Sequence, residues 1–381
     1  MKRVGMIVVV CLLLTLLPVP SRGLQPEVPG KSALLMDMTT GTVLYEHNAH
    51  EALPPASVTK VMTMLLIMEA IDSGNIKWDD VVTTSETAAA KGGSQIYLKV
   101  GETMTVSDMV KSIAVSSAND CACAMAEHLA GSEEAFVEKM NEKAKALGMN
   151  DTHFVNCTGL DDDEKAKEHL TSAYDIALMS RELMLNHPNI QKFTTIWMDT
   201  VRGGAFGLAN TNKLVRFYPG ATGLKTGFTT GAGYCLSATA QRDGLGLIAV
   251  VMGAESSKDR FAACKSMLDY GFANYALVEP EITEGVVTVR LGKADSVEAV
   301  PAESAQLLID KAQSNQVQIQ TVLEESVAAP VSKGQRLGTL TVKVGQQVVK
   351  EVPMVAKEGV ERLTWGDLFL KVLRQLSMAK P

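Results

Sequence analysis

Apolar residues alternate in strand-like runs near the start of the chain and again beyond residue 220, and between these regions they recur at helical spacing. The predicted strands span residues 32–37, 42–45, 222–228, 233–240 and 245–252. The predicted helices span residues 61–70, 106–129, 171–185 and 258–275. An antiparallel sheet flanked by helices, which takes strands from both ends of one domain and carries an all-helical lobe between them, accommodates this order. We therefore predict an α+β fold for residues 24–278.

The pattern changes after Val278. Short alternating runs over residues 286–291, 317–323 and 337–344 are separated by Gly and Pro. These runs are too short and too regularly interrupted for helices. They predict a small β-rich domain over residues 279–357.

The final segment, residues 358–381, has the pattern of an amphipathic helix. From Trp365 onward the apolar residues form a helical stripe, and Thr364 and Asp367 have the spacing of an N-terminal capping box. Three basic residues give this helix positive charge: Lys371, Arg374 and Lys380. We expect the helix to lie at a membrane surface, and the alternative is that it packs on the β-rich domain.

The chain begins with the pattern of a secretory signal. Lys2 and Arg3 precede an uncharged apolar run over residues 4–17, and prolines and small residues follow as far as Gly23. This run is shorter than the ~20 residues that a membrane-spanning helix needs. Cleavage of residues 1–23 is therefore expected, with an uncleaved anchor as the alternative.

Composition argues against a nucleic-acid partner. The 381-residue chain has 36 basic and 43 acidic side chains, and loss of the signal would leave 33 basic ones. Phosphate binding needs a basic face, which this acidic balance does not favour. The histidines show no metal-binding motif, and the cysteines outside the signal have no metal-ligand spacing and are expected to be buried apolar residues, so we predict no metal and no cofactor. These cysteines are Cys121, Cys123, Cys157, Cys235 and Cys264.

Three short motifs follow one another along the chain: Ser57-Val58-Thr59-Lys60, Ser117-Ala118-Asn119 and Lys225-Thr226-Gly227. Taken alone they are weak, because an S-x-x-K string recurs at Ser377 and an S-x-N string at Ser73. Their order, and the helix or strand predicted for each, favours a single active-site cleft that acylates a serine.

The first motif pairs a nucleophile with a base. A serine hydroxyl is a weak nucleophile until a base takes its proton, and Lys60 lies about one helical turn from Ser57. Shielding from water and a second positive charge, which Lys225 would supply, lower the pKa of a lysine and allow it to act as a base. Free backbone N–H groups after Pro54-Pro55 favour an oxyanion beside Ser57.

The other two motifs supply the remaining walls. Ser117 is suited to relay a proton to the leaving amine, and the Asn119 amide to hold a substrate carbonyl and Lys60. The third motif is predicted to be an edge strand, in which the Thr226 hydroxyl binds a carboxylate and Gly227 lets a substrate backbone approach closely. The N–H of Phe228 is expected to complete the oxyanion hole with that of Ser57.

This ordered set resembles the penicillin-binding protein and serine β-lactamase superfamily. More narrowly, it is similar to the low-molecular-mass penicillin-binding proteins that are D-alanyl-D-alanine carboxypeptidases. The resemblance covers nearly the whole chain, from the signal through a transpeptidase-like domain and a small β-rich domain to the amphipathic tail. The supporting strings are Pro55-Ala56-Ser57, Ser117-Ala118-Asn119-Asp120, Asn210-Thr211-Asn212, Gly223-Leu224-Lys225-Thr226-Gly227, Arg260-Phe261 and Tyr270-Gly271-Phe272.

The resemblance implies a serine-type carboxypeptidase that removes the terminal D-alanine from peptidoglycan stem pentapeptides and is acylated by β-lactam antibiotics. Ser57 would carry the acyl group and Lys60 would be the general base, with Ser117 and Asn119 assisting proton transfer. The residues that would bind the terminal carboxylate of the peptide are Lys225, Thr226 and Arg260. Such a protein is expected to be exported and peripherally bound at the outer face of the bacterial cytoplasmic membrane. Where some relatives have a histidine after K-T-G, this chain has Phe228, which keeps a backbone donor but removes any histidine side-chain role.

Two other activities stay open. A serine β-lactamase would need a glutamate in an E-x-x-L-N loop, and Glu182-Leu183-Met184-Leu185-Asn186 matches this string. Residues 171–185, however, have the pattern of one continuous helix, and a lactamase has no place for the β-rich domain and tail. A penicillin-recognising sensor that is acylated without turnover leaves no mark in a sequence, and release of free D-alanine would distinguish it.

Overall fold

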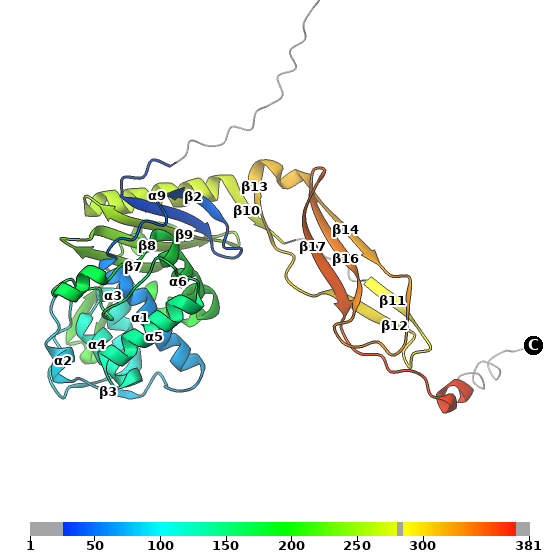
Figure 1. The fold of residues 1–381 in the computed structure, drawn as a ribbon, viewed down its shortest axis with the longest axis horizontal. Helices are drawn as coiled ribbons and strands as arrows, with labels where there is room; N and C mark the ends of the chain where they lie inside the picture. The colour runs from blue at the N-terminus through cyan, green and yellow to red at the C-terminus, as the bar shows by residue number, and fades with distance from the viewer. Residues whose placement is uncertain (1–25, 280–284, 371–381) are drawn as a thin grey trace, which may run out of the picture.

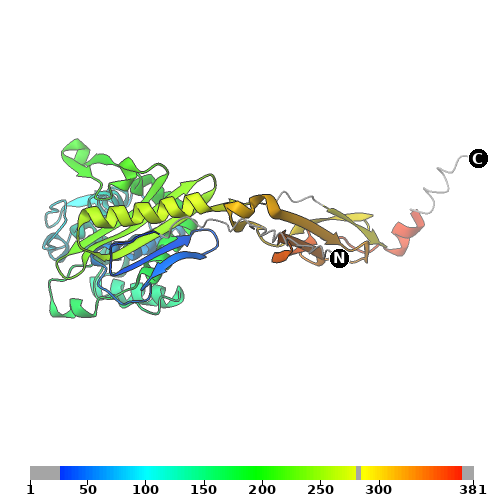
Figure 2. The same cartoon turned by 90° about the horizontal axis from the view of Figure 1, so that it is seen from above.

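A computed structural model describes residues 26–279 and 285–370 of the chain. The predicted signal and the end of the predicted tail helix lie outside the described residues. Figure 1 shows two bodies, one of helices around a sheet and one of long strands. Strands β10 (Tyr275–Val278) and β13 (Leu307–Asp310) pair with each other where the two bodies join, as Figure 2 also shows. The predicted boundary between Val278 and Glu279 stays a prediction.

The first body is built on a five-stranded antiparallel sheet in the order β2-β1-β9-β8-β7. The strands are β1 (Ser32–Asp37), β2 (Val43–His47), β7 (Ala221–Thr229), β8 (Gly233–Arg242) and β9 (Leu245–Ala254). Strand β1 pairs with β9, with Leu34 opposite Val250, so both ends of the domain contribute to one sheet. Strand β9 is buried on both faces, which explains its continuous apolar run. The predicted α+β arrangement is confirmed, and β7 is the edge strand.

Helices cover both faces of this sheet (Figures 1 and 2). Helix α9 (Ser257–Asn274) packs on one face, where Leu268 joins Leu236 and Leu247 of the sheet in a buried cluster. The other face merges with the core of the helical lobe, where α1 is buried over the greater part of its length because most of its residues before Glu69 are apolar. The lobe contains α1 (Lys60–Asp72), α2 (Glu86–Ala89), α3 (Val106–Ser116), α4 (Asn119–Ala130), α5 (Glu133–Ala146), α6 (Ala173–Asn186) and α7 (Gln191–Thr194). The short helix α8 (Leu214–Phe217) instead contacts β7, and its Leu214 belongs to the buried cluster on the α9 face.

Short elements complete the first body. Two strand pairs flank the lobe: β3 (Val81–Thr83) with β4 (Thr103–Thr105), and β5 (Met198–Val201) with β6 (Phe206–Ala209). The 3-10 turns are η1 (Ala56–Thr59), η2 (Glu164–Glu168), η3 (Pro188–Ile190) and η4 (Arg202–Gly204). The five described cysteines are free and buried, as predicted.

The predicted single helix over residues 106–129 is wrong, because the chain breaks between α3 and α4. Ser117 ends α3 in the left-handed region, with φ at +65°, and its N–H returns to the Ser112 carbonyl. Helices commonly end in this conformation, usually at Gly or Asn, so a serine gives little warning of it. The break leaves Ser117 and Ala118 between the two helices and places Asn119 at the first position of α4.

The second body is a six-stranded sheet in the order β14-β16-β17-β12-β11-β15, which confirms the predicted β-rich domain. Its buried core includes Leu340, Val352 and Val360. The strands are β11 (Gly285–Arg290), β12 (Ser296–Pro301), β14 (Val317–Leu323), β15 (Ser326–Ala328), β16 (Arg336–Val344) and β17 (Gln347–Ala356), and η5 (Lys311–Gln316) precedes β14.

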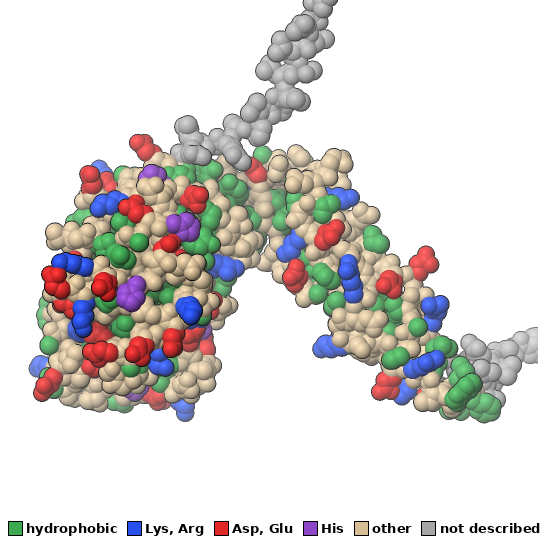
Figure 3. All heavy atoms as spheres, viewed as in Figure 1, with side chains coloured by type: hydrophobic (Ala, Val, Ile, Leu, Met, Phe, Trp, Pro, Cys, Tyr) green, Lys and Arg blue, Asp and Glu red, His purple; other side chains and the backbone are tan. Residues whose placement is uncertain are grey.

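The described chain ends in a helix that begins at Trp365. The Thr364 N–H donates to Asp367 Oδ2 (3.0 Å) and the Asp367 N–H to Thr364 Oγ1 (3.3 Å), which is the predicted capping box. Trp365 is 88% exposed, and Phe369 and Leu370 are also exposed. Figure 3 shows hydrophobic side chains gathered at this end of the β-rich domain. Within residues 26–279 and 285–370, no helix has the length and apolar character needed to cross a membrane.

Candidate active site

Ser57 and Lys60 meet at the start of α1. Ser57 lies in η1 and Lys60 is the first residue of α1, and the Lys60 Nζ lies 2.9 Å from the Ser57 Oγ. The expected first turn of an α-helix is thus a 3-10 turn, whose three residues per turn bring side chains i and i+3 directly above one another. Lys60 is fully buried, and its Nζ also donates to the Thr158 carbonyl at 2.8 Å.

Two buried lysines face this site from different elements. Burial lowers the pKa of Lys60 to about 7. Burial also lowers the pKa of Lys225, on β7, and the charges of Lys60 and Arg260 lower it further. The sequence predicts that shielding from water and a second positive charge together lower the pKa of Lys60. In the structure burial is the main cause, and the Cys157 and Asp120 side chains act in the opposite direction.

The S-x-N motif presents two polar atoms without protein partners. Ser117 Oγ and Asn119 Oδ1 are buried and have no hydrogen-bond partner among the described residues. The Asn119 Nδ2 donates to the Gly92 carbonyl at 2.7 Å, which fixes the amide orientation. The Lys60 hydrogen bonds go to Ser57 and Thr158, so the expected Asn119–Lys60 bond is not among them. Because an unpaired buried polar atom is costly, these two oxygens are suited to bind a polar ligand.

Strand β7 passes directly beside the Ser57 turn. A Cβ on Gly227 would lie 2.6 Å from the Pro55 carbonyl oxygen and 3.1 Å from the Ser57 nitrogen, so only glycine fits there. The Thr226 Oγ1 donates to the Thr211 Oγ1 at 2.7 Å. The close approach at Gly227 therefore involves the protein backbone, in addition to the substrate backbone that the sequence predicts.

Arg260 reaches this strand from α9. Its Nη1 donates to the carbonyls of Gly227 (2.8 Å) and Cys235 (3.2 Å). The C=O and N–H of a trans peptide point in opposite directions, so this bond aims the Phe228 N–H away from Arg260. The Phe228 ring is 52% exposed and stacks on Tyr234 with centroids 4.3 Å apart.

Sequence reasoning missed a loop that completes the site. The Thr158 carbonyl accepts from Lys60, and Gly159 follows with a φ of +80°. A Cβ on Gly159 would lie 1.8 Å from the Ala56 carbonyl oxygen. The string Asn156-Cys157-Thr158-Gly159 gives a turn signal in the sequence, but its contact with residues almost 100 positions earlier is a tertiary property.

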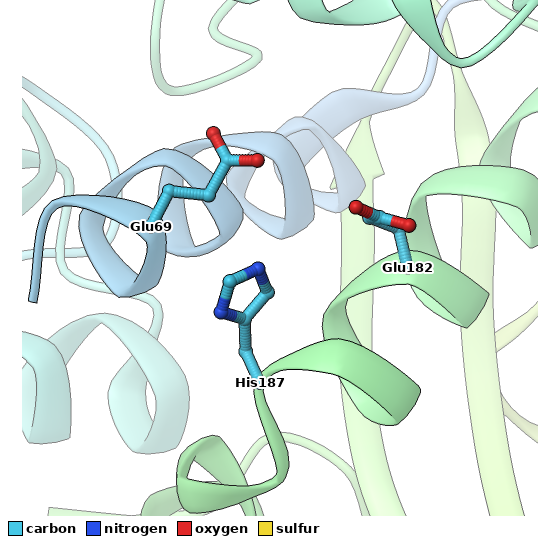
Figure 4. A group of neighbouring side chains, drawn as sticks. All are labelled: Glu69, Glu182 and His187. Carbon is cyan, nitrogen blue, oxygen red and sulfur yellow. The ribbon is translucent and has the colours of Figure 1, made fainter. Parts of the chain in front are cut away.

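Glu182 belongs to a separate cluster. It lies in α6 near Glu69 of α1 and His187, as Figure 4 shows. Lys143 binds both carboxylates, with Nζ–O distances of 2.6 Å to Glu69 and 3.1 Å to Glu182. The Lys143 ammonium neutralises this acidic group, so we interpret it as an ion-pair network that joins helices. Helix α6 is continuous across Glu182, which argues against the β-lactamase alternative.

The paired Ser57 and Lys60, the S-x-N turn and the K-T-G edge strand define an active-site-serine enzyme of the acyl-transfer class. A family model described as D-alanyl-D-alanine carboxypeptidase matches residues 21–256, and one described as penicillin-binding protein 5, C-terminal domain matches residues 275–362. The chain therefore belongs to the D-alanyl-D-alanine carboxypeptidase family.

Similar proteins agree with this assignment. D-alanyl-D-alanine carboxypeptidase DacF of Bacillus subtilis is 47% identical over 339 residues, which cover 87% of this chain and 86% of the relative. Penicillin-binding protein 5 of Haemophilus influenzae has a similar solved structure, with a TM-score of 0.75, 29% identity and coverage of 89% and 99% of the two chains. The ampicillin-bound structure of penicillin-binding protein D2 from Listeria monocytogenes is 34% identical, with a TM-score of 0.59 and coverage of 64% and 98%. The predicted class, a serine D-alanyl-D-alanine carboxypeptidase, is confirmed.

Proposed function

We propose that this protein removes the terminal D-alanine from peptidoglycan stem pentapeptides through an acyl-enzyme on Ser57. The observation that carries the proposal is the 2.9 Å contact between the Ser57 Oγ and a fully buried Lys60 Nζ. Burial brings the pKa of Lys60 to about 7, so much of this lysine is neutral near pH 7 and able to accept a proton.

In the acylation step, Lys60 takes the hydroxyl proton while the Ser57 Oγ attacks the carbonyl carbon of the penultimate D-alanine. The backbone N–H groups of Ser57 and Phe228 stabilise the negative oxygen that forms. The C–N bond to the last residue then breaks, and the proton passes through Ser117 to the leaving amine. Water, deprotonated by Lys60, attacks the ester, and the shortened peptide leaves with Ser57 restored.

The terminal carboxylate of the peptide would bind beside Lys225. Burial and the neighbouring positive charges lower the pKa of Lys225. A carboxylate bound beside it would favour the charged form of this lysine. Thr226 offers a hydroxyl at the same edge of β7. Arg260 adds positive potential, and its buried Nε has no hydrogen-bond partner among the described residues. This positive wall supports a carboxypeptidase that selects the free end of a peptide.

The direct test supplies a pentapeptide ending in D-Ala-D-Ala and measures D-alanine. We expect release by the full protein and a loss of at least ~10³-fold in Ser57→Ala, because the nucleophile is removed. A β-lactam should add its mass to the wild type and not to the variant, while both unfold at similar temperatures. Undiminished release by Ser57→Ala would refute the mechanism, and a wild type that is acylated but releases no D-alanine would support the sensor alternative.

We also propose that the tail holds the exported protein at the outer face of the cytoplasmic membrane. The exposed Trp365, Phe369 and Leu370 on one short helical segment support this, because large apolar side chains with basic neighbours favour a membrane interface. A chain that ends at Leu363 keeps Val360 in the β-rich core. We expect this shortened chain to stay soluble when mixed with anionic vesicles, while the full chain floats with them.

A second variant controls for the change in length. It is the full chain with Trp365→Glu and Phe369→Glu, which alters only two side chains. It should lose vesicle binding like the shortened chain. Both proteins should still release D-alanine from a soluble peptide. Vesicle binding by the shortened chain would place the anchor elsewhere.

A further inference from the structure

The residue before the nucleophile has an unusual backbone. Ala56 has a φ of +48°, in the left-handed region that residues with a side chain rarely adopt. Ala56 is buried, and it lies between two glycines that come from distant parts of the chain. A Cβ on Gly159 would strike the Ala56 carbonyl, and a Cβ on Gly227 would lie 3.1 Å from the Ala56 Cβ. The direction of the Ser57 turn therefore depends on how this residue is held.

A chain of hydrogen bonds ends on the Ala56 carbonyl. The Thr59 Oγ1 donates to this carbonyl at 2.8 Å, and the same hydroxyl lies 2.7 Å from the His169 Nε2. The Val155 N–H donates to the His169 Nδ1 at 3.0 Å. Thr59 and His169 are both buried, so water does not compete for these bonds.

The donor and the acceptor of each hydrogen bond in this series follow from the Val155 N–H. A backbone N–H can only donate, so Nδ1 accepts from Val155 and the proton of the neutral ring lies on Nε2. Burial keeps the ring neutral by lowering the pKa of His169 to about 4, and the charges of His153 and Lys60 act in the same direction. His169 thus donates to Thr59, and the Thr59 proton is directed to the Ala56 carbonyl.

We propose that His169, acting through Thr59, is a positioning residue that holds the left-handed turn at Ala56 and thereby aims the Ser57 Oγ at Lys60. The inference rests on the proposed function, because it assigns these residues to the acylation step. Displacing reacting groups by about 1 Å can lower a rate ~10²-fold. Loss of the hydrogen bonds through His169 and Thr59 is therefore expected to lower the acylation rate more than the affinity for the substrate.

The test uses two pairs of variants in the full protein. Thr59→Val replaces a hydroxyl by a methyl of similar size, and Thr59→Ser keeps the hydroxyl. His169→Phe keeps the ring and removes both nitrogens, while His169→Gln keeps one acceptor and one donor at similar spacing. For each, acylation by a fluorescent penicillin and D-alanine release are measured per active molecule, together with KM and the melting temperature.

We expect Thr59→Val and His169→Phe to acylate and turn over roughly 10- to 100-fold more slowly, with KM changed by less than about threefold. Thr59→Ser and His169→Gln should recover most of this loss. The double variant Thr59→Val/His169→Phe should be no slower than the worse single variant, because both act through one chain.

If folded Thr59→Val is acylated at the wild-type rate, the inference is overturned. The hydrogen bonds through Thr59 would then have only a structural role, even if the melting temperature of the variant is lower. Multiplying effects in the double variant would also overturn the inference. If His169→Phe does not fold, the Thr59 pair alone decides the outcome. A wild type that releases no D-alanine would refute the proposed function instead, and penicillin acylation would still rank the Thr59 variants.

Discussion

Lys60→Met is expected to slow acylation of Ser57 by between about 10² and 10⁴-fold, because it removes the group that accepts the hydroxyl proton. Methionine fits the buried site and removes the cost of desolvating an amine, while the Thr158 carbonyl loses its donor, so the two effects oppose each other and the melting temperature should change little. The measurement is stopped-flow acylation by a fluorescent penicillin. The matched control is Lys139→Met on the exposed side of α5, which should acylate at the wild-type rate.

The same lysine should set the acid limb of the pH profile. Burial lowers the pKa of Lys60 to about 7, and only the neutral amine is a base. The value of kcat/KM for D-alanine release should therefore fall about tenfold per pH unit below pH 7 and level off above it. A profile that stays flat down to pH 5 would exclude Lys60 as the base. The profile is measured on the wild type, with circular dichroism at each pH to show that the fold persists.

Among the glycines that the structure describes, Gly159 is expected to be the one where substitution by alanine is most damaging. The added Cβ would lie 1.8 Å from the Ala56 carbonyl oxygen and 2.7 Å from the Thr59 Oγ1, at a φ of +80°. Left-handed strain and overpacking together should lower the free energy of unfolding by about 3–5 kcal/mol. The molecules that still fold should acylate slowly, because the clash displaces Ala56.

Gly148→Ala separates the effect of left-handed backbone strain from the effect of overpacking. Gly148 has a similar φ of +74°, but a Cβ there would meet nothing within 4 Å. It should lower the free energy of unfolding by only about 1–2 kcal/mol and leave D-alanine release unchanged. Urea unfolding of both variants gives the comparison. Equal losses would show that Ala56 moves aside freely.

Local patterns were enough to predict the sheet, the β-rich domain and the three motifs. Strand β9 is a continuous apolar run and Lys60 lies three residues after Ser57, and both features are visible without any tertiary contact. The break at Ser117 was not predictable, because neither glycine nor proline marks it. The role of Thr158 depends on a hydrogen bond across 98 positions. The sequence predicts a lowered pKa for Lys60, but the complete burial that causes most of the shift depends on the residues packed around it. Such properties arise from packing.

The placement of Ala56 between Gly159 and Gly227 has a consequence for biogenesis. The three residues come from the N-terminal part of the domain, the helical lobe and the last strands of the sheet. We therefore expect the nucleophile to be directed only when the last of these regions has docked, so that a chain still being synthesised would have no competent serine. Folding of the whole domain and reactivity of Ser57 are in this sense coupled, since the serine becomes reactive only when the domain is complete.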